Sequence, residues 1–89
     1  MLTVKEGQTW AGDFAKKTAA QMGLDIRTFW RAPANGVDWT LEMTVEESGE
    51  SVGVSVWFLH LKKLEEKTKS KIKADIRRGL KELQAKIAA

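Results

Sequence analysis

The C-terminal third of the chain is the feature that most constrains its fold. Between residues 61 and 88, apolar side chains recur at helical spacings, and lysines and arginines fill most of the positions between them. This pattern predicts one long amphipathic helix whose apolar side packs against other elements. The apolar positions are Leu61, Leu64, Ile72, Ile76, Leu80, Leu83 and Ile87.

The preceding 60 residues predict a shorter helix and an antiparallel sheet. Apolar residues four apart over 10–22 predict the helix, with Thr9 as its N-cap, Gly12 allowing a close approach, and Gly23 ending it. Alternation of apolar and polar residues predicts strands over 24–31, 37–46 and 52–61, and a further short strand over 2–5.

These elements predict a single α+β domain over residues 1–89. We expect an antiparallel sheet of three to four strands with two helices on one face, in the order (β)-α-β-β-β-α. Trp10, Trp30 and Trp39 are expected in the core around the first helix, with room for a small ligand pocket among them.

The positive charge of the chain is concentrated in the last helix. Residues 61–89 carry ten Lys and Arg against four Asp and Glu, whereas residues 1–60 carry five against eight. The two parts therefore have net charges of +6 and −3, which give the chain's +3. Three interpretations are open: a solvated helix face, a surface that contacts phosphates or anionic lipid, or contact between the basic helices and acidic strands of neighbouring copies. The candidate anion-binding residues are Lys62, Lys63, Lys67, Arg77 and Arg78.

The residue types that carry most catalytic chemistry are sparse. The chain has no cysteine, which excludes disulfides and thiolate metal sites, and its single histidine, His60, has no partner at the spacing of a triad or a metal pair. We therefore expect no enzymatic activity and no cofactor. No leader and no transmembrane segment is expected, since no apolar run approaches about 18 residues. A cytoplasmic location fits this composition.

The predicted last helix is longer than the strands it covers. A helix over residues 61–88 spans roughly 40 Å, whereas strands of eight to ten residues span about 30 Å. Its last turns, with Leu80, Leu83 and Ile87, are therefore expected to overhang the sheet and to meet a partner. A homodimer, or association with an anionic surface or granule, would cover them.

The other face of the predicted sheet carries exposed apolar candidates. Phe29, Trp57 and Leu59 share this face with Arg27 and Arg31. Aromatic side chains beside arginines could stack on nucleobases or line a ligand site. Two further interpretations are a dimer interface across this face, or a one-residue register shift that returns these side chains to the core.

One resemblance covers both ends of the chain. The segment Lys71-Ile72-Lys73-Ala74-Asp75-Ile76, followed by Leu80 and Leu83, resembles the C-terminal pattern of the small polyhydroxyalkanoic acid system proteins, which are associated with polyester granule regions. The opening residues 2–4, the alanine-rich helix and Gly23 are similar too. Residues 65–67 depart from that family, which has an apolar stretch there. The resemblance implies granule association and no catalytic residues.

A second resemblance rests on the order of elements. Helix, three strands, helix is similar to double-stranded RNA-binding domains, and Ala32-Pro33-x-Asn35-x-x-x-Trp39 is similar in spacing to their Gly-Pro-x-His-x-x-x-Phe. Asn35 replaces the histidine, and Lys62-Lys63 is followed by Leu64 and Glu65 instead of the x-Ala that completes their phosphate-gripping segment. This resemblance implies lysines on phosphate, with Phe29 or Trp57 near a base or sugar.

We therefore expect a small non-enzymatic binding protein that dimerises or associates with a surface through its long basic helix and open sheet face. The alternative is a nucleic-acid-binding module. A small-ligand pocket between the sheet and the last helix is a third possibility.

Overall fold

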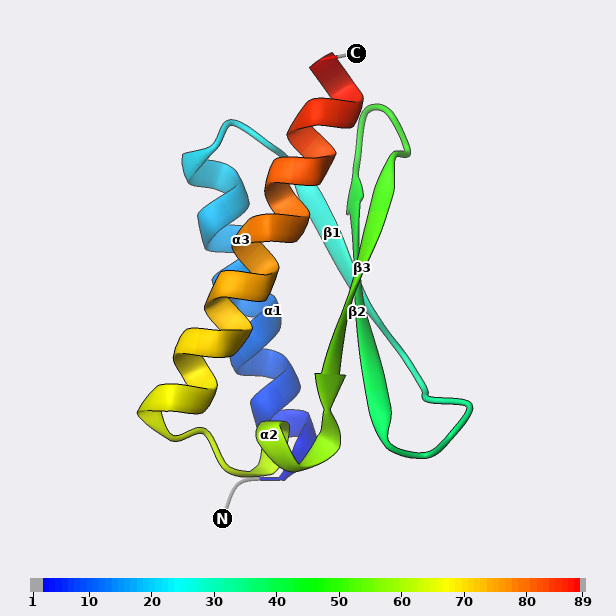
Figure 1. Ribbon diagram of the computed structural model, residues 1–89. Coiled ribbons are helices and arrows are strands. Elements are labelled where there is room, and N and C mark those ends of the chain that lie inside the picture. Colours follow the sequence, from blue (N-terminus) through cyan, green and yellow to red (C-terminus); the bar gives the residue numbers. More distant parts are fainter. Residues whose placement is uncertain (1–2, 89) are drawn as a thin grey trace.

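The fold is α+β, as predicted. The structure is a computed structural model that describes residues 3–88. Its three strands form one antiparallel sheet in the order β1-β2-β3, and the two long helices lie side by side on one face of that sheet (Figure 1). The elements in chain order are α1 (Val4–Gln21), β1 (Ile26–Arg31), β2 (Asp38–Val45), β3 (Ser51–Trp57), α2 (Phe58–Lys62) and α3 (Glu66–Ala88).

The first helix begins earlier than predicted. Thr3 is its N-cap: the Thr3 hydroxyl accepts a hydrogen bond from the backbone N–H of Glu6, and the Glu6 carboxylate accepts one from the backbone N–H of Thr3. This capping box satisfies two amide groups that the helix leaves free. The predicted strand over residues 2–5 is therefore wrong at positions 3–5, and position 2 lies outside the described residues. Thr9 is no cap, since its hydroxyl donates to the Lys5 carbonyl within the helix.

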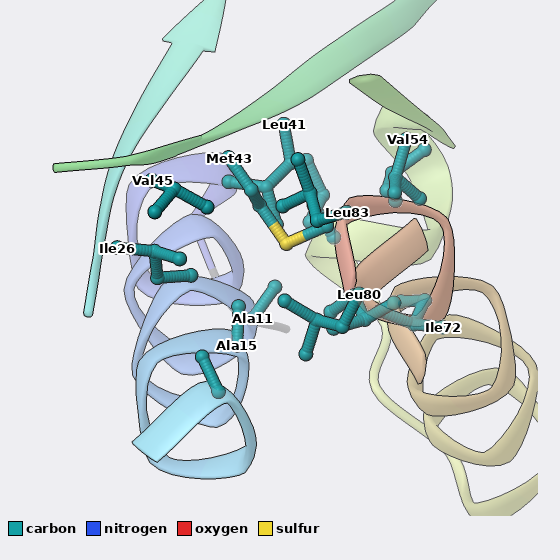
Figure 2. Close-up of a cluster of buried hydrophobic side chains, with 14 residues drawn as sticks. Ala11, Ala15, Ile26, Leu41, Met43, Val45, Val54, Ile72, Leu80 and Leu83 are labelled. Carbon is teal, nitrogen blue, oxygen red and sulfur yellow. The ribbon is translucent and has the colours of Figure 1, made fainter. Parts of the chain in front are cut away.

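Strand pairing gives the sheet one apolar face. Ile26 lies opposite Val45, and Leu41 lies opposite Val54. Because alternate side chains share a face, both helices pack on this side. Figure 2 shows the resulting core. The three tryptophans that we expected there, Trp10, Trp30 and Trp39, are half-buried and pack against it. The largest fully buried side chains are Leu41, Met43, Leu61, Ile76, Leu80 and Leu83.

The long helix predicted over 61–88 is interrupted. β3 ends at Trp57 and not at residue 61, α2 follows as a single short helix, and residues 63–65 are not helical. The interruption lets the backbone of Leu61 lie against α1 at Gly7, where a Cβ atom would collide with the Leu61 carbonyl oxygen. Burial of the Leu61 side chain accompanies this contact. The helix is interrupted at residues 63–65, next to this contact.

The expected overhang of the last helix is wrong for two of its three residues. Leu80 and Leu83 are 0% exposed, whereas Ile87 is 41% exposed. The interruption shortens α3 to 23 residues, or about 35 Å. Gly79 also lets α3 approach the sheet, because a Cβ atom there would lie 3.0 Å from Met43 Cε and 3.2 Å from Val54 Cγ2. Only the last turn extends past the core.

Candidate anion-binding surface

Cations of α3 cover two aromatic rings of α1. The rings of Trp10 and Phe14 are stacked, with centroids 6.2 Å apart and planes 12° from parallel. Lys69 Nζ lies 5.8 Å from the Trp10 centroid, Lys73 Nζ lies 5.5 Å from that of Phe14, and the Arg77 guanidinium carbon lies 5.3 Å from the same ring. These distances allow cation–π attraction.

Sequence spacing explains why the groups meet. Trp10 and Phe14 are four residues apart in α1, and Lys69, Lys73 and Arg77 are four apart in α3, so each set occupies one side of its helix. The two helices run in the same direction (Figure 1), so that successive turns of one face successive turns of the other. We call Lys69, Lys73 and Arg77 the cation row.

The charge of the cation row is uncompensated. Within residues 3–88, none of its three members lies within ion-pair distance of a carboxylate. The ion pairs of α3 lie on a different side of the helix, where Asp75 contacts both Lys71 at 3.0 Å and Arg78 at 3.2 Å. Arg78, a predicted anion-binding residue, is therefore already paired, whereas Arg77 belongs to the row.

A hollow of about 590 Å³ extends the cation row at the start of α3. Trp10 and Leu64 give it an apolar part, and Lys69 connects it to the row. Lys63 forms an ion pair with Glu65 at 3.2 Å, so Lys62 and Lys69 are the cations of the hollow without such a partner among the described residues. The residues that line the hollow are Glu6, Trp10, Lys62, Lys63, Leu64, Glu65 and Lys69.

The structure therefore gathers part of the predicted anion-binding set and adds to it. Lys62 and Lys63 line the hollow, Arg77 lies in the row, and Lys67 is exposed in the first turn of α3 without lining the hollow. Sequence reasoning had not grouped Lys69 and Lys73 with the aromatic rings of α1. Their four-residue spacing was visible in the sequence, but the side of α1 that they face was not.

The loop between β1 and β2 lies at the same end of the molecule as the start of α3 (Figure 1). Asn35 closes the loop: its side-chain oxygen accepts hydrogen bonds from the backbone N–H groups of Val37 and Asp38. Gly36 follows with a φ of 73°, in the left-handed region that glycine adopts freely. Asn35 therefore has a structural role at the position where the double-stranded RNA-binding pattern has histidine.

The open sheet face holds Phe29 as predicted, at 64% exposed, which excludes the interpretation that places it in the core. Its neighbouring arginines are engaged, since Arg27 pairs with Glu46 at 3.4 Å and Arg31 pairs with Glu42. The cationic partners for a base or phosphate beside Phe29 are thus already taken by carboxylates.

Trp57 and Leu59 do not join Phe29 in one patch. Strand pairing sets Phe29 opposite Glu42, and Glu42 opposite Gly53, so Trp57 lies two strands away and four residues further along. Four strand residues span about 13 Å. Leu59, 41% exposed, lies in α2 and not in the sheet.

The one histidine, His60, shares a hollow with Asp38, Ser55 and Asp75. His60 lies in α2, half-buried, with its ring edge-to-face against Trp57 at 5.2 Å. In the described part of the chain, no group of three or more His, Cys, Asp or Glu side chains is placed to hold a metal ion. Across residues 3–88, no helix combines the length and the apolar composition needed to cross a membrane.

A scan against models of protein families found no match to this chain, and searches of curated proteins and of solved structures found none either. The resemblances to polyhydroxyalkanoic acid system proteins and to double-stranded RNA-binding domains therefore stay predictions.

Proposed function

We propose that this protein binds double-helical RNA through the cation row and the hollow beside it. The observation that carries this proposal is the cation row itself. Its three positive charges have no carboxylate partner within residues 3–88, lie over Trp10 and Phe14, and are continued by the lysines of the hollow. Cations spaced along one helix suit the closely spaced phosphates of a nucleic acid. A pI of about 9.3, with the basic residues clustered along one helix, is typical of such proteins.

The state of the aromatic rings favours a duplex over a single strand. Proteins that bind single strands stack bases on exposed aromatic side chains. Trp10 and Phe14 are half-buried and already covered by cations, so their faces are not free for bases. What remains accessible is the positive charge, which suits contact with the sugar–phosphate backbone.

The arrangement of elements supports RNA as the duplex. Double-stranded RNA-binding domains recognise the RNA duplex by its shape, through contacts with phosphates and 2′-hydroxyls and largely without reading sequence. The order α-β-β-β-α with both long helices on one face is similar to theirs, and the β1–β2 loop and the start of α3 lie at one end of the molecule (Figure 1). Lys62 and Lys63, the lysines that we assign to phosphate, come shortly before α3 in the chain.

Surface association through an overhanging apolar helix, our first interpretation of the sequence, loses its main support. Leu80 and Leu83 belong to the core, so Ile87 alone of the three is exposed. An anionic membrane or granule surface would then have to attract the same lysines that we assign to RNA.

The test is the binding of a fluorescent RNA duplex of about 20 base pairs, measured by anisotropy over a range of salt concentrations. Replacing Lys69 and Lys73 with glutamine removes two charges of the row. We expect at least a tenfold loss of affinity at low salt, and a salt slope smaller by about two, because each lost phosphate contact lowers that slope by about one.

The matched control replaces Arg27 and Arg31 with glutamine. It removes the same charge from the opposite, sheet side of the molecule, where both arginines have carboxylate partners. Its affinity for RNA should stay near that of the unmodified protein. Equal losses in both variants, or no RNA binding even at low salt, would overturn the proposal. Binding to anionic vesicles without binding to RNA would replace it with surface association.

A further inference from the structure

The outer edge of β3 carries backbone groups that the sheet does not use. The N–H of Phe58 donates to the carbonyl of Val37, and the N–H of Val45 donates to the carbonyl of Glu50. Hydrogen-bonded pairs alternate along antiparallel strands, so residues 52, 54 and 56 face β2 with their backbone groups. The N–H and C=O groups of Gly53, Ser55 and Trp57 therefore point outward. Lys86 covers the next outward carbonyl, that of Ser51, at 3.0 Å.

Beside this edge, α3 presents charged residues of alternating sign. Lys71, Asp75, Arg78 and Glu82 follow one another along the helix, and they line a hollow of about 310 Å³ together with residues 52–55 of β3. We call these four residues the alternating row. The pair Lys71 and Glu82 and the pair Asp75 and Arg78 are both centred on the same point of the helix, between positions 76 and 77.

This symmetry makes the alternating row complementary to itself. When a second copy is turned about a two-fold axis through that point, Lys71 faces Glu82 of the other copy and Asp75 faces Arg78 of the other copy. Identical surfaces meet across such an axis, so each contact occurs twice. The axis also falls near Ser55, because Gly79 lies against Val54, and Asp75 shares a hollow with Ser55.

The position of α3 leaves room for this arrangement. Gly79 lies above Met43 of β2 and Val54 of β3, which places the helix between those two strands. Strands are spaced about 4.8 Å apart, so α3 is set back from β3 by about half that distance. Pairing of two β3 strands then puts the two α3 axes about 10 Å apart, close to the upper end of ordinary helix packing distances.

We propose that two copies of this chain associate through their β3 edges into one continuous antiparallel sheet, closed by the alternating rows of the two α3 helices. Pairing centred on Ser55 sets Gly53 opposite Trp57 of the other copy. The Trp57 side chain, 42% exposed in the single chain, gains a neighbour that has no side chain of its own. Aromatic residues beside a cross-strand glycine protect the backbone there. This interface goes beyond the proposed RNA-binding function and uses a different side of α3.

The other free edge of the sheet lacks this symmetry. The edge of β1 runs beside α1, where Lys5, Asp13 and Lys16 line a hollow with Thr28 and Trp30. A two-fold axis at this edge brings lysines of the two copies together, with one carboxylate per chain between them. Repulsion of like charges disfavours pairing there, so we assign the interface to β3 alone.

Charge reversal tests the interface, with the molar mass in solution measured by light scattering over a range of concentrations. The unmodified chain of 10.0 kDa should form a species of about 20 kDa. Lys71→Glu sets glutamates against each other and Glu82→Lys sets lysines against each other. Each single variant should therefore weaken dimerisation at least tenfold.

Two rescue experiments distinguish loss of a contact between copies from a structural effect within one chain. The double variant Lys71→Glu/Glu82→Lys exchanges the charges and should dimerise again. An equimolar mixture of the two single variants should form a mixed dimer, since their rows are then complementary. Ser55→Pro should give a folded monomer, because it removes an outward N–H that the single chain does not use.

A monomer at every concentration of the unmodified chain would overturn the proposal. So would single variants that dimerise as well as the unmodified chain, or a mixture that remains monomeric. Circular dichroism of each variant verifies that the chain is folded before its mass is interpreted.

Discussion

Single glycines decide how closely the last third of the chain approaches the first helix. The sequence placed the close approach at Gly12, yet a Cβ atom there would lie 3.7 Å from the Thr28 hydroxyl oxygen, an ordinary contact. The close approach is at Gly7, against the backbone of Leu61. Backbone at such a distance cannot be moved aside as a flexible side chain can, so Gly7 carries the constraint.

Alanine at these two positions should have opposite effects. Gly7→Ala forces α1 and α2 apart, and we expect it to lower the free energy of unfolding by about 2 kcal/mol or more, as overpacked cores do. Gly12→Ala replaces a glycine inside the helix at a position with space for the added methyl group. Because alanine favours the helix, this change should raise the free energy of unfolding by up to about 1 kcal/mol. Urea denaturation of both variants measures the difference. Equal stabilities would contradict the contact between Gly7 and Leu61.

The N-terminal cap offers a second comparison of single residues. Thr3→Ala removes the hydroxyl that accepts the N–H of Glu6, and should cost about 1 kcal/mol of stability. Thr9→Ala removes a hydroxyl that only donates within the helix, and should change stability by less than about 0.5 kcal/mol. Thermal unfolding ranks the two variants. A larger loss for Thr9→Ala would mean that the helix begins where the sequence alone had placed it.

At the scale of elements, hydrophobic periodicity predicted most of the fold. Alternation over β2 and four-residue spacing over α1 each depend on one buried face, so local sequence carries them. The interruption after α2 was missed because Leu61 and Leu64 continue the apolar stripe through it. The sequence did contain a sign of the interruption, since every residue between Leu64 and Ile72 is polar. The contact that accompanies the interruption, between Leu61 and Gly7, joins segments that are distant in sequence.

The candidate site was less accessible to sequence reasoning than the fold. Lys62 and Lys63 were identified because a basic pair stands out locally. The cation row depends on which side of α3 meets Trp10 and Phe14, and that follows from tertiary packing. Charge pairing has the same dependence, since Arg27 and Arg31 looked available until strand register set them beside Glu46 and Glu42.

The corrected position of the last turns of α3 is itself testable. Leu83→Ala leaves a cavity in the core and should lower the free energy of unfolding by about 2–5 kcal/mol, whereas Ile87→Ala, at a partly exposed side chain, should cost less than about 1 kcal/mol. Both variants are measured by urea denaturation at low protein concentration. Similar small losses would instead favour the overhanging helix that the sequence suggested.

At the scale of the whole molecule, three sides of α3 have three different roles. One side carries Ile76 and Leu80 into the core, the cation row faces α1, and the alternating row follows the edge of β3. The proposed two-fold axis is perpendicular to the sheet, so it keeps all four long helices on the same face. A dimer would therefore present two cation rows to one partner, and two linked sites bind more tightly than one.

This arrangement predicts how dimerisation affects RNA binding. Ser55→Pro changes no charge and no residue of the cation row, so each monomer should keep its intrinsic contact with phosphates. On a duplex long enough for both rows, we expect the variant to bind at least tenfold more weakly, with about half the salt slope of the dimer, because half as many counterions are released in each binding event. Anisotropy titrations at several salt concentrations measure both quantities, and light scattering gives the oligomeric state separately. A monomeric variant whose salt slope equals that of the dimer would show that the two cation rows act independently. If neither the unmodified protein nor any variant binds RNA, the RNA-binding proposal is rejected and the proposed dimer is unaffected.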